Sequence, residues 1–542
     1  MGLAFSVAAA DSIDKCQPDH PCELSGGNPC HACVPRIELE SRITNTKQQL
    51  VAMEKMFKEM LDQHRELRTI TNRVHNPIIL RAPPEIASYI FQLCIPHDLT
   101  GNDSFESLRN AVRGPLTLGA VCQDWRRIAW STPQLWSTVS ICLADWIGSS
   151  RIELIQEWLD RSKALPLSIY LYDSLDGALA RAERSQPQDF EDYCSSITQV
   201  SNALNQHSHR WKDLDISIPS PYLALFSNVP QPSTTICSLK IWASDFFVRP
   251  AKFHMKNLSP SSVSLESITF KSVVINWSNV TWVDISTIQM EACYRLLKLA
   301  PRLKYCKFFN IIVPEYALER TSTIVHPFLE DFTFEQIEEE LDFFFDCLAF
   351  PRLKRLAIET REGLPVNMLL SFLRRSSCDL KEFCIRHTDI AIPDLITFVQ
   401  EIPSLVKLDI NPCNANFSPH ELFRLLALPS SIREAEGSVK RLSVDPHPLL
   451  PNLRSLRYTA DGNNAMPWDL VPQVFGLIPE LSNPGRRPLR SLHIHLSEDR
   501  PPYPGTNQLS KNVVRALRTL RKAGMDIKIV TQKLSKVVHI IF

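Results

Sequence analysis

Apolar residues recur every seven positions in the segment 37–76, where most other positions are Glu, Lys, Arg or Gln. The apolar grid positions are Ile43, Leu50, Met53, Phe57, Met60, Leu67 and Val74, and Thr46, His64 and Thr71 fill the same grid. Because no Gly or Pro interrupts the segment, it is predicted to be one long helix with a narrow apolar seam, as in coiled coils. Pro77 is expected to end this helix. Two alternatives stay open: the seam of 43–74 pairs with a second copy, or it lies against the rest of this chain.

Helical spacing returns in two shorter stretches of 77–145. Ile86, Ile90 and Leu93 follow each other at i, i+4 and i+7, after prolines suited to a first helical turn. In the second stretch, the apolar residues at helical spacing are Leu118, Val121, Cys122, Trp125 and Ile128. A Pro-Gln-Leu-Trp turn follows at 133–136. The pattern predicts a small all-α unit.

From about residue 205 a six-residue pattern keeps returning: an apolar residue, two mostly polar ones, an apolar one, a variable one and a β-former. The copies begin at Trp211, Leu265, Leu303, Leu329, Leu353, Leu380, Leu405, Leu453 and Leu489. Between Leu303 and Leu405 the successive starts are 26, 24, 27 and 25 residues apart. This spacing is typical of leucine-rich repeats, whose period is roughly 20–29 residues. Each copy predicts a strand with its lead-in turn, and the copies stack because one alone cannot bury its apolar edge.

Helix-like stretches separate the predicted strands at 337–348, 366–374 and 394–400. Later gaps between copies lengthen to 48 and 36 residues, which indicates degenerate copies or insertions. We therefore expect an α/β fold in which 205–542 forms a leucine-rich-repeat-like solenoid. The alternative is an unrelated α/β domain in which Leu-Lys-x-Leu merely recurs.

The C-terminal segment predicts a last helix and a last strand. The helix covers 509–522, with Ser510 as its N-cap and Gly524 at its end. Ile527, Ile529 and Val530 then indicate a strand. We interpret the basic surface of this helix as a solvated face rather than a contact for RNA or acidic lipid.

Five regions follow from these patterns. They are a disordered leader at 1–36, a coiled-coil helix at 37–76, the all-α unit at 77–145, a helical connector at 146–204 and the repeat region at 205–542. The leader is assigned from its Pro, Gly and Cys content and its lack of periodicity.

Composition argues against several functional classes. Acidic and basic residues balance at 59 each, so no net field recruits nucleic acid. No apolar run reaches the roughly 18–20 residues that span a bilayer. Glycine is scarce, at 15 of 542 residues, and the common phosphate-loop, zinc-protease and nucleophile-elbow motifs are absent. We expect no catalytic residue and no cofactor.

The cysteines indicate a reducing compartment, since most lie in apolar contexts such as those of Cys94 and Cys384. Buried, reduced thiols in the cytoplasm or nucleus are therefore expected. The N-terminal cysteines are Cys16, Cys22, Cys30 and Cys33. Only the last pair has the spacing of a zinc site, so we interpret the group as unliganded, with zinc as the alternative. Gly2 and Ser6 fit a loose myristoylation pattern, against an ordinary chain start.

The order Pro-Pro-Glu-Ile, Ile-Phe, Val-Cys-x-x-Trp-Arg and Pro-x-Leu-Trp within 83–136 resembles an F-box. It is most similar to the F-box-like proteins of mushroom-forming fungi, in which a predicted coiled coil also precedes the box. The resemblance implies docking on the Skp adaptor of a cullin–RING ubiquitin ligase. It implies an adaptor-facing surface at Pro84, Ile86, Ile90 and Phe91. It implies a supporting core, partly touching the adaptor, at Leu118, Val121, Cys122 and Trp125.

One residue departs from the family pattern: Ala82 stands where the family usually has Leu. If that Leu fills an adaptor pocket, binding is weaker here by about 1–3 kcal/mol.

The expected function is substrate recognition within an SCF-type ligase, with the F-box unit binding the Skp adaptor and cullin complex and the repeats binding an unidentified protein substrate. The alternative is a non-catalytic interaction scaffold that does not engage the ligase, its F-box-like helices only packing on the repeats. A weaker alternative is an enzyme, which would require Asp, His and Glu side chains converging in the repeat region.

Overall fold

The computed structural model of the chain describes residues 33–75, 82–95, 104–143, 152–173, 187–227, 229, 235–243, 252–312, 322–336, 344–360, 363–413, 417–427, 449–461, 466–476, 487–498, 509–533 and 536–540. These residues form two compact units: one contains those up to Cys94 together with 116–131, and the other contains 95–115 and everything from Thr132 onward. The predictions for Gly2, Ser6, Cys16, Cys22, Cys30 and Pro77 lie outside the described residues.

Helix α1 (Cys33–His75) runs unbroken for 43 residues, which confirms the long N-terminal helix. It begins at Cys33 rather than at Ile37, so the last four residues of the predicted leader are helical. Pro35 does not prevent this, because a proline in the first turn gives up a backbone N–H that has no partner there.

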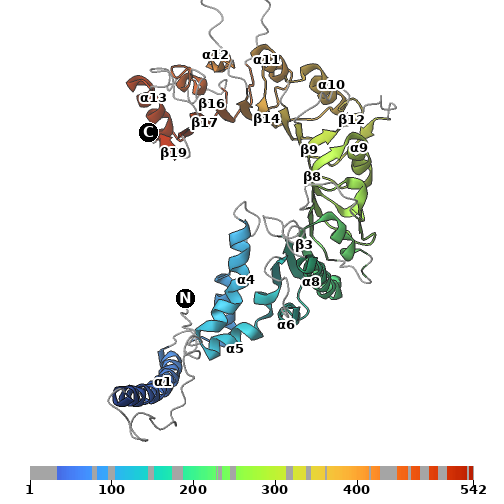
Figure 1. The fold of residues 1–542 in the computed structure, drawn as a ribbon. Coiled ribbons are helices and arrows are strands. Elements are labelled where there is room, and N and C mark those ends of the chain that lie inside the picture. The colour runs from blue at the N-terminus through green and yellow to red at the C-terminus, as the bar shows by residue number, and fades with distance from the viewer. Residues whose placement is uncertain are drawn as a thin grey trace, which may run out of the picture. The chain divides into compact units, whose positions relative to one another are not determined.

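Helix α3 (Pro84–Leu93) confirms the first predicted stretch. The second stretch is divided at Cys122 between α4 (Ser104–Val121) and α5 (Gln123–Ser131), and α4 begins earlier than the spacing predicted (Figure 1). Phe91 of α3 is fully buried, and its ring centroid lies 4.7 Å from that of Trp125 on α5. Gly119 of α4 allows Trp130 to approach the helix backbone, because a Cβ at this position would overlap the indole ring. These two contacts join α5 to α3 and to the part of α4 from Leu116 onward, which belongs to the first unit.

The second unit is built on a 15-stranded sheet within the described residues. Its strands are β1 (Thr138–Cys142), β2 (Leu167–Tyr172), β3 (Trp211–Ile218), β4 (Ser238–Ala243), β6 (Ser262–Glu266), β8 (Trp282–Gln289), β9 (Tyr305–Ile312), β11 (Asp331–Gln336), β13 (Arg355–Thr360), β14 (Glu382–Thr388), β15 (Lys407–Pro412), β16 (Ser455–Asp461), β17 (Ser491–Glu498), β18 (Asp526–Lys533) and β19 (Lys536–Ile540). They neighbour one another in chain order. Every pair is parallel except β18 with β19. Two short parallel pairs lie beside the sheet: β5 (Phe253–His254) with β7 (Val273–Val274), and β10 (Ile324–Val325) with β12 (Leu348–Ala349).

Two rows of buried apolar side chains cross the sheet from β1 to β18, with one residue of each row on every strand. The first row is Val139, Ile169, Leu214, Leu239, Val263, Val283, Cys306, Phe332, Leu356, Phe383, Leu408, Leu456, Leu492 and Ile527. The second row is Ile141, Leu171, Ile216, Ile241, Leu265, Ile285, Phe308, Phe334, Ile358, Ile385, Ile410, Tyr458, Ile494 and Ile529. Because the rows lie two residues apart on each strand, both point to the same face of the sheet.

Helices and turns cover this face, and Figure 1 shows α9, α10 and α11 on one side of the sheet. The helices of the unit are α6 (Ile152–Arg161), α8 (Pro187–Gln206), α9 (Met290–Leu299), α10 (Val366–Ser376), α11 (Ile392–Gln400), α12 (Pro419–Ala427) and α13 (Lys511–Lys522). Their apolar residues join the same core, for example Leu296, Phe372 and Phe398. The 3-10 turns are η2 (Pro133–Trp136), η4 (Ser208–Arg210), η5 (Ser220–Phe226), η6 (Phe270–Ser272), η7 (Trp277–Asn279) and η8 (Pro472–Phe475).

Most of the strands predicted from the six-residue pattern are present. Seven of them start two residues after the leading leucine: those led by Leu303, Leu329, Leu353, Leu380, Leu405, Leu453 and Leu489. The strand predicted from Trp211 begins at Trp211 itself. The prediction at Leu265 is out of phase, because Leu265 occupies the second row near the end of β6 and the residues after it enter the turn η6.

The predicted intervening helices are confirmed in two of three places, where α10 and α11 lie. The third prediction, 337–348, is wrong for its described part: residues 344–347 form a turn that leads into β12. The predicted connector 146–204 contains α6 and most of α8, but also strand β2. Since β2 pairs with both β1 and β3, the sheet begins at Thr138 rather than near residue 205.

The C-terminal helix and strand are confirmed as α13 and β18. The Ser510 hydroxyl accepts a hydrogen bond from the Val513 N–H at 3.3 Å. Gly524 has φ of 89°, a left-handed value that favours glycine where a helix ends.

Candidate functional site

The first candidate surface is an apolar stripe on α3. Ile86, Tyr89 and Leu93 lie on one side of this helix and are 51, 59 and 64% exposed. Ile90, which lies between them on the helix surface, is half-buried. The opposite side of α3 buries Ala87 and Phe91. Helix α3 is therefore apolar on both sides, and only one side packs against its own unit.

The end of α4 adds two more exposed apolar side chains, Leu116 and Val121, each 48% exposed. Leu118 is half-buried. The Cys122 Sγ accepts a hydrogen bond from the Trp125 N–H at 3.5 Å, and Arg126 Nε donates to the Gly119 carbonyl at 2.9 Å. These contacts tie the α4–α5 junction together. We define the docking face as the exposed apolar residues of α3, which are Ile86, Tyr89 and Leu93.

The F-box resemblance divided eight residues between an adaptor-facing surface and a supporting core, and the structure places some of them differently. Pro84 and Ile86 are exposed, as an adaptor-facing role requires, and Ile90 is half-buried. Phe91 is fully buried against Trp125, so it belongs to the supporting core. Val121 is exposed, so it belongs to the surface. Leu118, Cys122 and Trp125 are half-buried.

Sequence reasoning did not assign Tyr89, Leu93 or Leu116 to the surface. Leu93 was visible in the stripe with Ile86 and Ile90, and Tyr89 completes that stripe at i, i+3, i+4 and i+7. The signal was therefore available for α3. The position of Leu116, directly after Pro115 inside α4, offered no comparable pattern.

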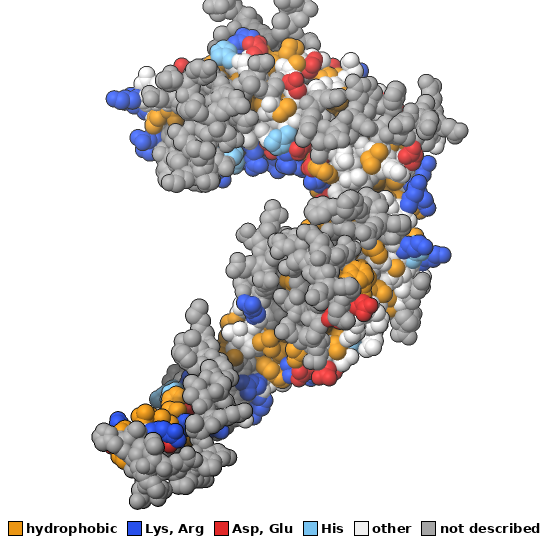
Figure 2. Space-filling view, in the orientation of Figure 1, with side chains coloured by type: hydrophobic (Ala, Val, Ile, Leu, Met, Phe, Trp, Pro, Cys, Tyr) orange, Lys and Arg blue, Asp and Glu red, His pale blue; other side chains and the backbone are white. Residues whose placement is uncertain are grey.

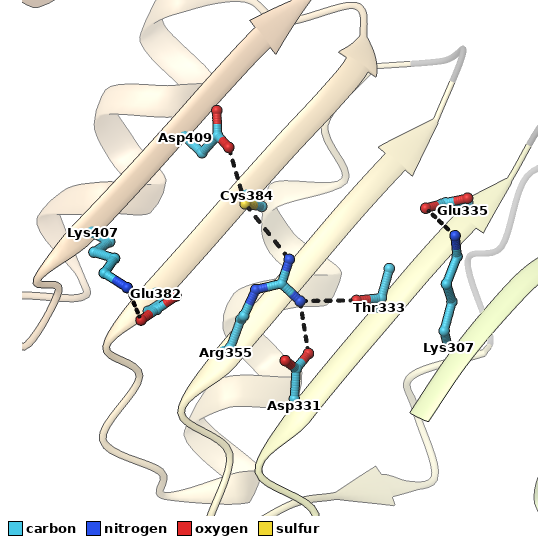
Figure 3. Close-up of polar contacts among 9 residues, drawn as sticks. All are labelled: Lys307, Asp331, Thr333, Glu335, Arg355, Glu382, Cys384, Lys407 and Asp409. Atoms are coloured by element: carbon cyan, nitrogen blue, oxygen red, sulfur yellow. Dashed lines mark hydrogen bonds and ion pairs between the residues drawn. The ribbon is translucent and has the colours of Figure 1, made fainter. Parts of the chain in front are cut away.

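The second candidate surface is the open face of the sheet, which bears the strand residues that alternate with the two buried rows. Arg355 of β13 donates to the Asp331 carboxylate at 2.8 Å and to the Thr333 hydroxyl at 3.1 Å on β11 (Figure 3). Its other terminal nitrogen lies 4.0 Å from Cys384 Sγ on β14, and this thiol lies 3.6 Å from Asp409 on β15. The side chains of four consecutive strands are thus linked across the face.

Lysine–glutamate pairs extend this network along the same face. Lys407 Nζ lies 2.6 Å from Glu382, and Lys307 Nζ lies 2.9 Å from Glu335 (Figure 3). Asp284 is the carboxyl next to Lys307 in register. Burial raises the pKa of Asp284, and the neighbouring carboxylates of Glu335 and Glu266 raise it further against the opposing effect of Lys307.

An aromatic pair lies on the open face beside these charges. The rings of Trp282 on β8 and Tyr305 on β9 are stacked, with centroids 5.1 Å apart and planes 5° from parallel. Burial, with Asp284 and Asp331 nearby, raises the pKa of Tyr305 to about 12. Stacked rings and paired charges form a surface suited to contact with another protein, because aromatic and Arg side chains carry much of the binding energy at interfaces.

One cluster of polar side chains on β17 and β18 could favour the enzyme alternative. It contains Ser491, His493 and Asp526. His493 Nε2 lies 2.8 Å from Asp526 Oδ2 and 3.3 Å from the Ser491 hydroxyl. In a catalytic triad the acid and the nucleophile lie on opposite nitrogens of the imidazole ring. Here both contact Nε2, so the cluster is not arranged to relay a proton.

The buried thiols are equally unsuited to nucleophilic chemistry. Cys293 and Cys306 are fully buried, and burial raises the pKa of each thiol. A protonated thiol in an apolar core is a weak nucleophile. Cys384 is buried as expected, whereas Cys94, the residue directly after α3, is exposed.

Among the described residues, no group of three or more His, Cys, Asp or Glu side chains is placed to hold a metal ion. None of the helices that the structure describes is both long and apolar enough to cross a bilayer. No protein-family model matches this chain, and no curated protein is significantly similar to it in sequence.

Proposed function

We propose that this chain is the substrate-recognition subunit of an SCF-type cullin–RING ubiquitin ligase, acting in the cytoplasm or nucleus. The docking face binds the Skp adaptor, and the parallel sheet, as a leucine-rich-repeat solenoid, binds a protein substrate through its open face. The chain supplies no catalytic residue or cofactor, and other subunits transfer ubiquitin.

The observation that carries the proposal is the docking face itself. Ile86, Tyr89 and Leu93 expose more than half of their surface, although burial of that remaining surface would contribute roughly 1–2 kcal/mol for each apolar side chain. Adjacent exposed apolar residues on a small helical unit are typical of an interaction site. The F-box-like order of motifs in 83–136 supports the Skp adaptor as the proposed partner.

The sheet supports the substrate-binding half of the proposal. From Ile216 to Ile410, residues of the second buried row lie 20 to 27 residues apart along the chain. This spacing and the chain-order parallel pairing fit leucine-rich repeats. A substrate held on the open face would be presented at high effective concentration to the ligase, which is the whole mechanism required.

Co-purification with the Skp adaptor of the same organism tests the adaptor half. Ile86→Asp/Leu93→Asp places two charges on the docking face without touching buried side chains, so adaptor binding is expected to be lost. Asn512→Asp/Thr519→Asp adds the same charge at exposed positions of α13 and is expected to bind like wild type. Thermal unfolding of each variant shows whether the fold is unchanged.

A well-folded wild-type chain that fails to bind the adaptor would refute the ligase role and favour the scaffold alternative. Binding by wild type that survives Ile86→Asp/Leu93→Asp would refute the docking face as its site.

A further inference from the structure

Helix α1 exposes more apolar surface than any solvated helix needs. Every α1 side chain whose exposure is described is exposed. The large apolar ones are Val34, Ile37, Leu39, Ile43, Leu50, Val51, Met53, Met56, Phe57, Met60, Leu61, Leu67, Ile70 and Val74. Figure 2 shows hydrophobic side chains on the surface of α1, beside Lys and Arg. Within the described part of the chain, nothing covers them.

Contacts within α1 do not explain its stability as a helix. Its described ion pairs, Arg36 with Glu40 and Arg65 with Asp62, are both 2.9 Å long and exposed. Exposed pairs of this kind contribute about 0–1 kcal/mol. Since most helical stability in proteins comes from packing of an apolar face, the uncovered apolar residues of α1 point to a partner.

The spacing of the apolar residues specifies the shape of that partner. The seam repeats every seven residues from Leu39 to Val74, and only Thr46, His64 and Thr71 are polar on it. A seven-residue repeat keeps its seam on a partner only if two helices supercoil around each other. A helix packed on a globular surface follows a 3.6-residue period instead.

The partner must also match α1 in length, about 65 Å at 1.5 Å per residue. The next longest helices in the described part of the chain are α8, with 20 residues, and α4, with 18. Helix α8 already packs against the sheet, because its Tyr193, Ile197 and Leu204 are buried in the core there. A second copy of α1 has the required length and the same seven-residue repeat.

We propose that two copies of this chain pair through α1, forming a two-stranded coiled coil along Leu39–Val74. Leu50 and Phe57 lie in the apolar part of its seam. The flanking Met56 and Leu61 add apolar area at the seam edges. The pairing does not depend on the ligase role, since it uses a helix outside the docking face.

The molar mass of the full-length chain in solution tests the pairing. At micromolar concentration, light scattering after size exclusion is expected to give twice the 61.7 kDa of one chain. Leu50→Asp/Phe57→Asp places charges in the seam and is expected to halve the mass. Ser41→Asp/Gln48→Asp adds the same charge on the opposite side of α1 and is expected to leave the mass doubled.

Hydrogen exchange gives a second readout that separates pairing from misfolding. The α1 amides are expected to be protected in wild type and to lose protection in Leu50→Asp/Phe57→Asp, while α13 amides stay unchanged. A monomeric wild type, a mass of three or more copies, or a seam variant that keeps the doubled mass would each overturn the proposal. Adaptor binding is measured separately, so failure of either proposal is visible by itself.

Discussion

Neighbouring residues of α3 have opposite roles although all are apolar. Phe91 is buried against Trp125, while Ile86 is half exposed on the other side of the helix. Substitutions at the two positions should therefore separate stability from binding. A variant that combines them, such as Ile86→Asp/Phe91→Asp, would confuse loss of the docking face with loss of the fold.

Phe91→Ala is expected to destabilise the first unit by about 3–5 kcal/mol, because it leaves a cavity beside Trp125. Ile86→Ala should change stability by no more than about 0.5 kcal/mol, as is usual for surface positions. Hydrogen exchange of the α3 and α5 amides measures both changes. Equal effects at the two positions would mean that α3 presents a different side to its own unit.

Asp284 is a carboxyl whose folded-state pKa lies above its unfolded value of 3.8, chiefly through burial. Its protonated form is therefore favoured by folding. The stabilisation that the protonated Asp284 contributes is complete below the pKa of the unfolded chain. It is lost as the pH rises through the pKa of the folded chain. At neutral pH the ionised side chain is consequently a net cost to the fold.

Asp284→Asn is therefore expected to stabilise the chain at pH 7, by about 0.5 kcal/mol, the scale of interactions among partly exposed charges. The gain should shrink as the pH falls through the raised pKa of Asp284, because wild type also becomes neutral at this position below that pKa. Urea unfolding of both proteins at several pH values measures the difference. A gain that stayed constant with pH would point to packing rather than charge.

At the scale of the element, α13 shows how local signals fix a boundary. Ser510 caps its N-terminus through the Val513 N–H, and Gly524 follows its C-terminus with positive φ. One face buries Val513, Leu517 and Leu520. Cap, apolar stripe and terminating glycine all agree, which explains why the predicted boundary differs from the observed one by only two residues.

Ser510→Ala is expected to destabilise α13 by about 1 kcal/mol, because the Val513 N–H loses its acceptor. Ser510→Asp retains an acceptor and should restore most of the loss. Exchange rates of the first-turn amides of α13 report the effect. Unchanged rates in Ser510→Ala would show that the cap does not stabilise this helix.

At the scale of the whole molecule, the sheet is built by pairing strands that follow one another along the chain. Each strand from β2 to β18 pairs with the strands that precede and follow it in the sheet. Paired charges such as Arg355 with Asp331 and Lys407 with Glu382 join adjacent strands at the open face. If two chains pair through α1, two docking faces and two open faces belong to one assembly, and avidity strengthens binding to a partner with repeated sites.

The sequence by itself determined the features that depend on local periodicity. The seven-residue repeat defined α1, and the Leu-x-x-Leu-x-β pattern located strands from β9 to β17. Strands β1, β2, β4, β6 and β8 carry the same alternation of buried residues. Three of them, β1, β4 and β8, fit the pattern as well as the copy led by Trp211 does, because Trp136, Ile236 and Val280 are apolar leading residues. In β2 and β6 the leading position holds Pro166 and Pro260, which interrupt the pattern.

Only the tertiary structure decided which side of an apolar element is buried. Periodicity marks Phe91 and Ile86 alike as apolar positions of a helix, but the ring of Trp125, 34 residues after Phe91 in the chain, selects Phe91 for the core. Likewise, the partner of Arg355 is set by the register of β13 on β11. A sequence pattern shows which residue types favour burial or charge pairing at a position. Whether a side chain is buried or paired depends on the residue that packs against it in the folded chain.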